Sequence, residues 1–438
     1  MLDIQFIRDH VSELKEVIQL KKIHLDLDEL LKIDSERLAL LQELENLQRN
    51  RNENANAIKN SGAKPSEEAI EEGKRLKFAI LAVEAKKDDI DMKFQQLMVR
   101  VPTIHAVDTP LGKDDSENVE VEKWGEPRKF DFTPKDHITL GKDLDILDLE
   151  RGAKVGGYRG YFVKGDGVLL MMGFMMYAIQ KMAQKGYEMI IPPTLIKGQY
   201  LFGSGYFKGT EYNADVDEVY KVASPDKDAE GKHTEDKFLV GTSEPSLLAY
   251  YSDEVLEESQ LPMKLSGYSQ CYRSEIGSYG RDTKGMYRVH EFMKVEQIIL
   301  CPADIEMADK LQREMLDISQ ELHRDFGLPY RTLRICTGDL SAGKYKQFDM
   351  EAWIPSRDGY GETGSSSNFL DWQARRLNVK YKTKDGDRKH VFMLNNTMLP
   401  SPRIFISILE NYQNEDGSIT VPEVLRALVG KDRITKKP

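Results

Sequence analysis

Residues 271–296 read CYRSEIGSYGRDTKGMYRVHEFMKVE, and this stretch says the most about the fold. Both of its ends have the composition of β-strands, whereas its middle is rich in glycine and charge, as loops are. An arginine on such a strand can hold a phosphate, a glutamate can accept from an amine, and a phenylalanine can stack on a base. Taken singly, such residues are more often surface charges and core aromatics, so the interpretation rests on their joint order.

Further β-rich stretches lie on both sides of this segment, separated by irregular segments and a few helices. They are residues 188–191, 238–240, 295–300 and 391–394. Short strands in this arrangement are typical of an antiparallel β-sheet with flanking helices. We therefore predict an α+β fold for this part of the chain.

The N-terminal region has a different pattern. From residue 27 to residue 59, leucines recur every three or four residues among charged residues, without proline or glycine, which predicts one long helix. After a break at residues 60–65, helical spacing resumes and continues to Pro102. Each helix would span roughly 50 Å, so we predict an antiparallel coiled-coil hairpin that projects from the body. A hairpin of this kind can also serve as a dimerisation coiled coil or as a spacer.

Residues 103–157 are rich in Asp, Glu, Lys, Gly and Pro, with few apolar runs, and we interpret them as a connector. We therefore expect an N-terminal domain at residues 1–104. A second domain, at residues 105–438, would hold the connector and the sheet.

Charge and cysteine content limit the possible functions. The 438 residues carry 73 acidic and 62 basic side chains, a net charge of −11, so binding to a nucleic acid must rest on local groups. Cys271, Cys301 and Cys336 are too far apart to indicate a close-spaced metal site or a disulfide framework, which favours a reducing cytoplasm. The most apolar run, residues 167–179, is shorter than the ~20 residues of a spanning helix, and we expect neither export nor membrane insertion.

The usual glycine-rich nucleotide signatures are absent, so ATP, if bound, is held in another way. The order of residues 271–296 instead resembles motif 2 of the class II aminoacyl-tRNA synthetases, in its seryl form. Residues 186–193 (GYEMIIPP) resemble motif 1, and residues 395–397 (NNT), 402–403 (PR) and 409–413 (LENYQ) resemble motif 3. Residues 241–244 (GTSE) are similar to the serine loop of that family, and residues 362–368 (ETGSSSN) with 371–376 (DWQARR) to its ATP and metal segment. The resemblance covers nearly the whole chain.

The resemblance implies a role for each matching residue. Arg273 would hold the α-phosphate of a bent ATP and Arg403 its far phosphates, while Phe292 would stack on the adenine. The ATP set is Arg273, Ser274, Glu275, Val289, Phe292, Glu362, Thr363, Gly364, Ser365 and Arg403. Glu362 and Ser365 would also carry Mg²⁺, a hard ion that prefers oxygen ligands.

The serine set implied by the resemblance is Thr242, Ser243, Glu244, Glu296, Asn395 and Thr397. Which carboxylate contacts the ammonium group of serine and which its hydroxyl group stays open. The residues expected to act in catalysis are Arg273, Arg403 and Glu296.

Three stretches depart from the common family pattern. Glu291 stands where many members have glutamine, and residues 201–207 (LFGSGYF) replace the more familiar Thr-Gly-Gln-Leu-Pro stretch. Residues 395–397 differ from the Asn-Gly-Ser of many bacterial members but keep a hydroxyl group at Thr397.

The activity implied by the resemblance is ATP-dependent activation of L-serine to seryl-adenylate and transfer to the 3′ end of tRNA(Ser), or of tRNA(Sec) where present. A cytoplasmic homodimer is implied as well. The alternatives are a synthetase-like ligase that loads an amino acid onto a carrier protein, and a non-catalytic paralogue. The predicted hairpin argues against the first, and the retained Arg273, Arg403 and Glu296 argue against the second.

Overall fold

A computed structural model of the chain describes residues 2–60, 64–223, 227, 229–232, 235–276 and 284–436. The chain divides into two compact units, Leu2–Val101 and Pro102–Pro438. Part of the predicted break at residues 60–65, and the middle of the loop predicted within residues 271–296, fall outside the described residues. Among the described helices, none is long and apolar enough to cross a membrane.

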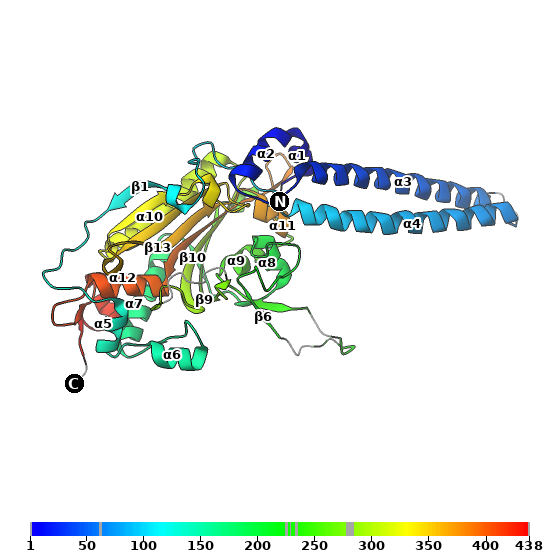
Figure 1. The fold of residues 1–438 in the computed structure, drawn as a ribbon. Coiled ribbons are helices and arrows are strands. Elements are labelled where there is room, and N and C mark those ends of the chain that lie inside the picture. The colour runs from blue at the N-terminus through cyan, green and yellow to red at the C-terminus, as the bar shows by residue number, and fades with distance from the viewer. Residues whose placement is uncertain are drawn as a thin grey trace. The chain divides into compact units, whose positions relative to one another are not determined.

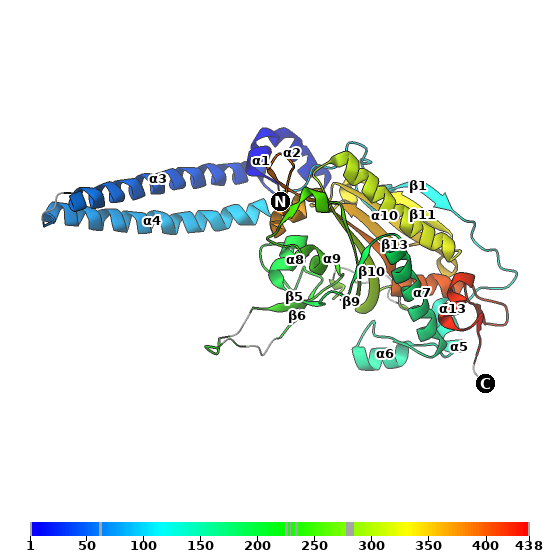
Figure 2. The same ribbon diagram turned by 180° about the vertical axis from the view of Figure 1, so that it is seen from behind.

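The first unit consists of helices. Two short ones, α1 (Ile4–Asp9) and α2 (Val11–Leu20), precede α3 (Leu27–Asn60) and α4 (Glu67–Met98). The predicted long helices are thus confirmed, and Figures 1 and 2 show α3 and α4 side by side along their length. Ser66 caps α4, because its hydroxyl accepts a hydrogen bond from the Ala69 amide at 3.2 Å.

The seam between α3 and α4 is narrower than the leucine pattern suggests. Leu44, Ile80 and Val83 are buried there, whereas Leu38 and Leu81 are 41% and 51% exposed. In a two-helix hairpin each helix has a single neighbour, so only part of an apolar stripe is covered.

The second unit is built on an eight-stranded sheet with the order β1-β11-β12-β13-β16-β10-β9-β4. All neighbouring strands are antiparallel except β4 and β9, which are parallel. This confirms the predicted antiparallel sheet. The strands are β1 (Val119–Trp124), β4 (Glu188–Ile190), β9 (Met263–Tyr272), β10 (Glu291–Cys301), β11 (Tyr330–Arg334), β12 (Lys346–Ile354), β13 (Gly359–Asn368) and β16 (Phe392–Pro400).

Strand alternation gives the middle of this sheet two different faces. On one face lies α10 (Ile305–Asp325), to which Asn396 of β16 donates hydrogen bonds at the Ser319 hydroxyl (2.7 Å) and the Met315 carbonyl (3.3 Å). Asn396 pairs with Gln297 of β10. Glu296 and Thr397 are the neighbours of these two residues in their strands, so they face the other side of the sheet, where they contact each other. That second face carries the candidate site.

The main core joins the sheet to α7 (Asp166–Gln184), α10 and α12 (Ser401–Asn411). Figure 2 shows α13 (Arg426–Val429) beside α7. The remaining elements are α5 (His137–Asp143), α6 (Leu149–Gly156), α8 (Gly198–Ser204), α9 (Glu244–Ala249), α11 (Trp372–Leu377), β2 (Leu147–Asp148), β3 (Phe162–Val163), β5 (Leu195–Lys197), β6 (Tyr220–Val222), β7 (Lys237–Leu239), β8 (Val255–Glu257), β14 (Lys380–Lys382), β15 (Arg388–His390), β17 (Ile419–Thr420), β18 (Arg433–Ile434) and the 3₁₀ turns η1 (Asp115–Glu117), η2 (Glu258–Gln260), η4 (Thr337–Asp339), η5 (Pro355–Arg357) and η6 (Glu423–Leu425).

Two segments differ from the expectation. The predicted connector supplies β1, an edge strand of the main sheet paired with β11. This strand was not predicted, because its Val-Glu-Val-Glu alternation lies among charged residues. The predicted strand at residues 238–240 forms as β7, but in a separate three-stranded sheet with β5 and β6.

Candidate active site

One pocket opens on the face of the sheet opposite α10. Its walls come from β10, β13 and β16, from the segments that flank residues 277–283, and from the start of α12. The lining residues include every predicted ATP residue except Ser274 and Ser365, and they include Thr397 from the serine set. The fold therefore brings together side chains that are up to 130 residues apart in the sequence.

Arg273 follows the end of β9 and is held at several points. Its backbone amide donates to the His290 carbonyl at 3.0 Å, and the His290 ring nitrogen Nδ1 lies 2.8 Å from the Arg273 carbonyl. The guanidinium Nε donates to the Gly241 carbonyl at 3.1 Å, and the group lies 5.6 Å from the centre of the buried Phe292 ring. Arg273 is thus placed beside an aromatic face, with donors remaining for an anion.

Arg403, in the first turn of α12, faces Glu362 of β13 across the pocket. Its Nη1 donates to the Glu362 carbonyl at 3.0 Å and lies 3.1 Å from the Glu362 carboxylate. Burial raises the pKa of Glu362, but the charges of Arg403 and Arg273 outweigh burial and hold this pKa below its usual value. Burial lowers the pKa of Arg403, and the charge of Glu362 reverses that shift and raises it. Both groups therefore stay charged.

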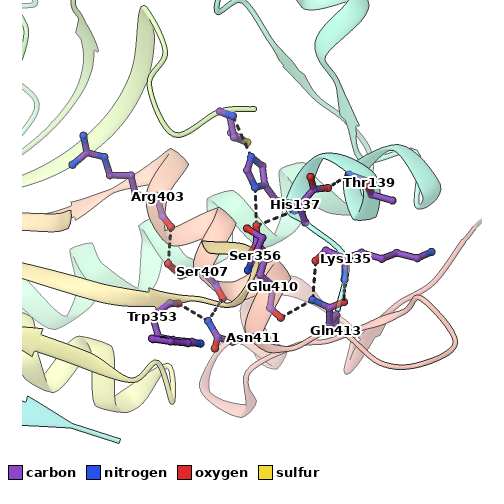
Figure 3. Close-up of polar contacts among 12 residues, drawn as sticks. Lys135, His137, Thr139, Trp353, Ser356, Arg403, Ser407, Glu410, Asn411 and Gln413 are labelled. Carbon is purple, nitrogen blue, oxygen red and sulfur yellow. Dashed lines mark hydrogen bonds and ion pairs between the residues drawn. The ribbon is translucent and has the colours of Figure 1, made fainter. Parts of the chain in front are cut away.

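A buried polar network braces α12 from behind (Figure 3). Glu410 of α12 accepts hydrogen bonds from the backbone and ring nitrogens of His137 at 3.0 and 2.8 Å, and from the Ser356 amide at 2.9 Å. The other ring nitrogen of His137, Nε2, accepts from the Met286 amide at 3.3 Å. The His137 ring thus lies between the Glu410 carboxylate and the Met286 amide. The network ties the helix that carries Arg403 to the segment that leads into β10.

Glu275 lies where the chain leaves β9, and its φ of +54° is in the left-handed region, which is strained for a residue with a side chain. Its carboxylate accepts a hydrogen bond from the Arg288 guanidinium group at 3.0 Å and lies 3.8 Å from that of Arg159. Val289 is buried in the pocket wall, close to Phe292 in sequence. Glu275, Val289 and Phe292 thus line the same pocket as the two guanidinium groups.

Lys294 of β10 and Thr397 of β16 line the pocket and belong to a buried cluster around Glu296. The buried Lys294 forms an ion pair with the buried Glu296 and donates to the Thr397 hydroxyl at 3.2 Å. Glu296 also accepts from the hydroxyl groups of Thr242 at 3.2 Å and Thr397 at 3.5 Å. Two of the residues predicted to bind serine, Thr242 and Thr397, thus meet around the carboxylate of a third, Glu296.

The other residues predicted to bind serine lie near this cluster in the fold. Glu244, at the start of α9, is buried and accepts hydrogen bonds from Tyr206 at 3.0 Å and Gln373 at 2.7 Å. Asn395 is buried on β16, two positions before Thr397. The Ser243 hydroxyl is buried without a hydrogen-bond partner among the described residues, close to Gly267 of β9. Gly267 pairs directly with Glu296, so the Ser243 side chain lies on the same face of the sheet as Glu296.

The remaining predicted ATP residues take different positions. The Thr363 hydroxyl lies 2.8 Å from His323 of α10, so Thr363 reaches the pocket only through its other atoms. The Ser365 hydroxyl accepts from Gln347 at 3.1 Å, and Gln347 also donates to Asp349 at 2.8 Å. Burial and the charge of Glu362 raise the pKa of Asp349 to about 7. The Ser274 hydroxyl is buried, with no partner among the described residues.

Three polar residues that line the pocket were not predicted from the sequence, namely Tyr287, Arg288 and Lys294. Neither were Asp349, Tyr206 and Gln373, which contact residues of the site. A signal for Lys294 was present: Phe292 and Glu296 lie on one strand at even spacing, so residue 294 must share their face. Tyr206, just after α8, and Gln373 of α11 reach Glu244 from segments far from it in sequence, and spacing gives no signal for such contacts.

The arrangement has two chemically different halves. Two guanidinium groups beside an aromatic ring suit a nucleotide polyphosphate, since bidentate donors match phosphate oxygens. Buried carboxylates and hydroxyl groups suit a small ligand with an ammonium group and a hydroxyl group. Lys294 joins the two halves, because it lines the pocket and contacts Glu296.

Comparison with known proteins agrees with this geometry. Residues 1–105 match the model of the seryl-tRNA synthetase N-terminal domain, and residues 220–412 match that of the tRNA synthetase class II core domain (G, H, P, S and T). The serine–tRNA ligase of Treponema denticola is 39% identical over 438 residues, which cover 99% of this chain and 100% of that protein. The ligase of Deinococcus radiodurans is 38% identical, with both chains fully covered.

Solved structures give the same result. The seryl-tRNA synthetase of Pyrococcus horikoshii, in complex with ATP, is similar with a TM-score of 0.88 and 30% identity over the full length of both chains. The cytoplasmic serine–tRNA ligase of Naegleria fowleri, in complex with AMP, has a TM-score of 0.84 and 28% identity over 100% of this chain and 99% of that one. The fold, the paired halves of the pocket and these full-length similarities together show that the chain belongs to the seryl-tRNA synthetase family, within the class II aminoacyl-tRNA synthetases.

Proposed function

We propose that this chain activates L-serine with ATP and transfers the seryl group to the 3′ end of tRNA(Ser), and of tRNA(Sec) where that tRNA is present. The observation that carries the proposal is the pairing, in one pocket, of Arg273 and Arg403 with the buried cluster around Glu296. A nucleotide site or an amino-acid site alone would need only one of these halves.

In the first step, the serine carboxylate attacks the α-phosphorus of ATP and pyrophosphate leaves. Arg273 would hold the α-phosphate, Arg403 the far phosphates, and Phe292 the adenine ring. Two fixed guanidinium groups lower the barrier because they spread the charge that develops on the departing pyrophosphate. The residues supply position and charge, and no covalent bond to the enzyme forms.

Selection for serine would rest on Glu296 and Thr397. Their contact, together with Thr242, presents buried hydrogen-bonding groups that a serine hydroxyl can satisfy. Alanine has no hydroxyl group to bond to this cluster, so it would lose the hydrogen bonds that serine gains there. Threonine must be refused by size. Glu244, Asn395 and Ser243 would complete the surroundings of the amino acid.

We also infer that Mg²⁺ accompanies the ATP. The carboxylate of Glu362 and the hydroxyl of Ser365 are hard oxygen donors, and burial together with the charge of Glu362 raises the pKa of Asp349 beside them, so the residues fit such an ion. The described part of the chain has no group of three or more His, Cys, Asp or Glu side chains able to hold a metal, so phosphate oxygens and water would supply most ligands. When bound, the ion neutralises phosphate charge.

In the second step, the 3′-terminal hydroxyl of the tRNA attacks the seryl-adenylate. We propose that residues 1–104 form a tRNA-binding domain and that residues 105–438 form the connector and catalytic domain. Basic side chains on α3 and α4 are the candidates for phosphate contacts: Arg49, Arg51, Lys74, Arg75 and Lys77. Such contacts would recognise the shape of the RNA backbone more than its sequence.

A homodimer is the proposed assembly. Helix α7 exposes Val168, Leu169, Met172 and Met176, each between 41% and 44%, which form an apolar stripe at helical spacing, and Ile191 after β4 is 82% exposed. A two-fold contact through this region would cover these side chains. Sedimentation at micromolar protein concentration tests the assembly, and a monomer with full charging activity would contradict it.

We place the enzyme in the cytoplasm, where its substrates are and where three free, buried cysteines stay reduced. The function is tested by incubating the purified chain with ATP, Mg²⁺, radioactive serine and tRNA(Ser). We expect acid-precipitable, RNase-sensitive seryl-tRNA. Serine found only on a carrier protein, with uncharged tRNA, would favour the alternative ligase.

A further inference from the structure

Residues 201–207 depart from the common family pattern, and through Tyr206 they contact Glu244. Glu244 belongs to the serine half of the site, by which we mean the residues predicted to bind serine. Helix α8 ends in this stretch, and Gly205 follows with a φ of +92°. A Cβ atom at Gly205 would lie 2.9 Å from the ring of Trp372 of α11. Glycine is therefore required for the turn, which is followed at once by Tyr206.

Tyr206 contacts the buried Glu244. Its hydroxyl donates to Oε2 of the carboxylate at 3.0 Å, while the Gln373 side chain donates to Oε1 at 2.7 Å. Gln373 also donates to the Ser204 carbonyl at the end of α8, at 3.0 Å. Each oxygen of Glu244 thus has its own donor, and the two donors come from neighbouring elements that also contact each other.

The two carboxylates of the serine half differ in their charge balance. Glu296 has an ion pair with Lys294, whereas Glu244 has no ion pair within the described residues, and its side-chain donors are neutral. Burial and the nearby charge of Glu296 raise the pKa of Glu244, and the hydrogen bonds from Gln373 and Tyr206 oppose that rise. Glu244 is therefore the carboxylate whose charge is left for a ligand to neutralise.

We propose that Tyr206 is a positioning residue for amino-acid binding: its hydroxyl fixes the Glu244 carboxylate in the orientation that accepts the ammonium group of serine. This inference rests on the proposed function. Tyr206 does not touch the substrate in this account, and it acts only through Glu244. The nucleotide half of the pocket, which contains neither residue, does not depend on it.

The Tyr206→Phe variant tests the proposal, because it removes one hydroxyl group and keeps the ring that packs against the cluster around Phe207 and Phe238. A hydrogen bond to a charged group is worth enough to change an equilibrium roughly 10- to 100-fold. We expect the KM for serine in ATP–pyrophosphate exchange to rise at least tenfold. The kcat and the KM for ATP should stay within threefold of the parent.

Tyr212→Phe is the matched control. It removes a tyrosine hydroxyl from the same cluster, where that hydroxyl donates to the Val219 carbonyl at 3.3 Å and does not contact Glu244. The control should leave all three kinetic constants within threefold of the parent.

Three results would overturn the proposal, and they can be told apart. If Tyr206→Phe matches Tyr212→Phe, the hydroxyl does not position Glu244. If the KM for ATP rises together with that for serine, or kcat falls with it, Tyr206 has only a general structural role. If the parent shows no serine-dependent exchange at all, the proposed function itself has failed.

Discussion

Lys294, which lines the pocket, forms a buried ion pair with Glu296, and each is too buried to be hydrated as a lone charge. Removing one partner of such a pair leaves the other without compensation, which commonly destabilises a protein by about 3–5 kcal/mol. The pair therefore has two consequences, one for stability and one for the chemistry of the serine half.

For stability, we expect Lys294→Met to lower the free energy of unfolding by about 3 kcal/mol at neutral pH. The double variant Lys294→Met/Glu296→Leu should recover a large part of that loss, because it leaves no lone buried charge. Chemical denaturation of the parent, the single and the double variant measures both values. Equal losses in the single and the double variant would show that the pair is not electrostatically coupled.

We propose that Arg273 and Arg403 bind the phosphate groups of ATP in the pocket. Replacing either with alanine should lower seryl-adenylate formation roughly 10²-fold or more, because about 2.7 kcal/mol or more of charge stabilisation is lost. Arg433→Ala is the control, since this exposed arginine pairs with Asp416 away from the pocket. Exchange within a few-fold of the parent in the Arg273 or Arg403 variant would mean that the phosphate roles are wrongly assigned.

Among the elements, the segment that leads into β10 packs closely against α5. Gly285 lies there with a φ of +72°, and a Cβ atom on it would be 2.1 Å from Nε2 of His137. His137 connects this segment to Glu410 of α12, so a displaced ring disturbs the helix that carries Arg403.

Gly285→Ala should therefore lower the melting temperature and raise the KM for ATP. Gly386→Ala separates the two causes, because Gly386 also has a positive φ (+93°) but nothing lies within 4 Å of its added Cβ. Backbone strain alone costs on the order of 1 kcal/mol, and the clash should make Gly285→Ala clearly worse. Differential scanning calorimetry with exchange kinetics gives both quantities, and identical behaviour of the two variants would contradict the role of His137.

The sequence predicted elements better than their partners. The long helices and the strands at residues 188–191 and 295–300 follow from local composition, and the structure confirms them. The contact of Tyr206 and Gln373 with Glu244 depends on how α8, α9 and α11 pack, which no local pattern encodes. Likewise β1 lies in a segment read as a connector, because an exposed edge strand has charged residues on both faces.

In the whole molecule, we propose that the two units have different tasks: the second unit activates serine, and the first unit binds the tRNA that is needed for the transfer step. The N-terminal unit carries none of the predicted serine or ATP residues, and its helices α3 and α4 are mostly charged at their surface. A chain that starts near residue 105 should therefore keep serine-dependent ATP–pyrophosphate exchange and lose most tRNA charging. Circular dichroism and the melting temperature establish that the shortened chain is folded. Equal loss of both reactions in a folded protein would mean that the hairpin is part of the catalytic machinery.

The central claim is that this pocket activates serine and recognises its hydroxyl group. ATP–pyrophosphate exchange without tRNA tests this most directly, with serine and alanine compared at equal concentrations. We predict rapid exchange with serine and exchange with alanine slower by a factor of roughly 10⁴, because alanine lacks the hydroxyl group that would hydrogen-bond to Glu296 and Thr397. Exchange with alanine at a rate comparable to serine, or no dependence on serine, would contradict the account.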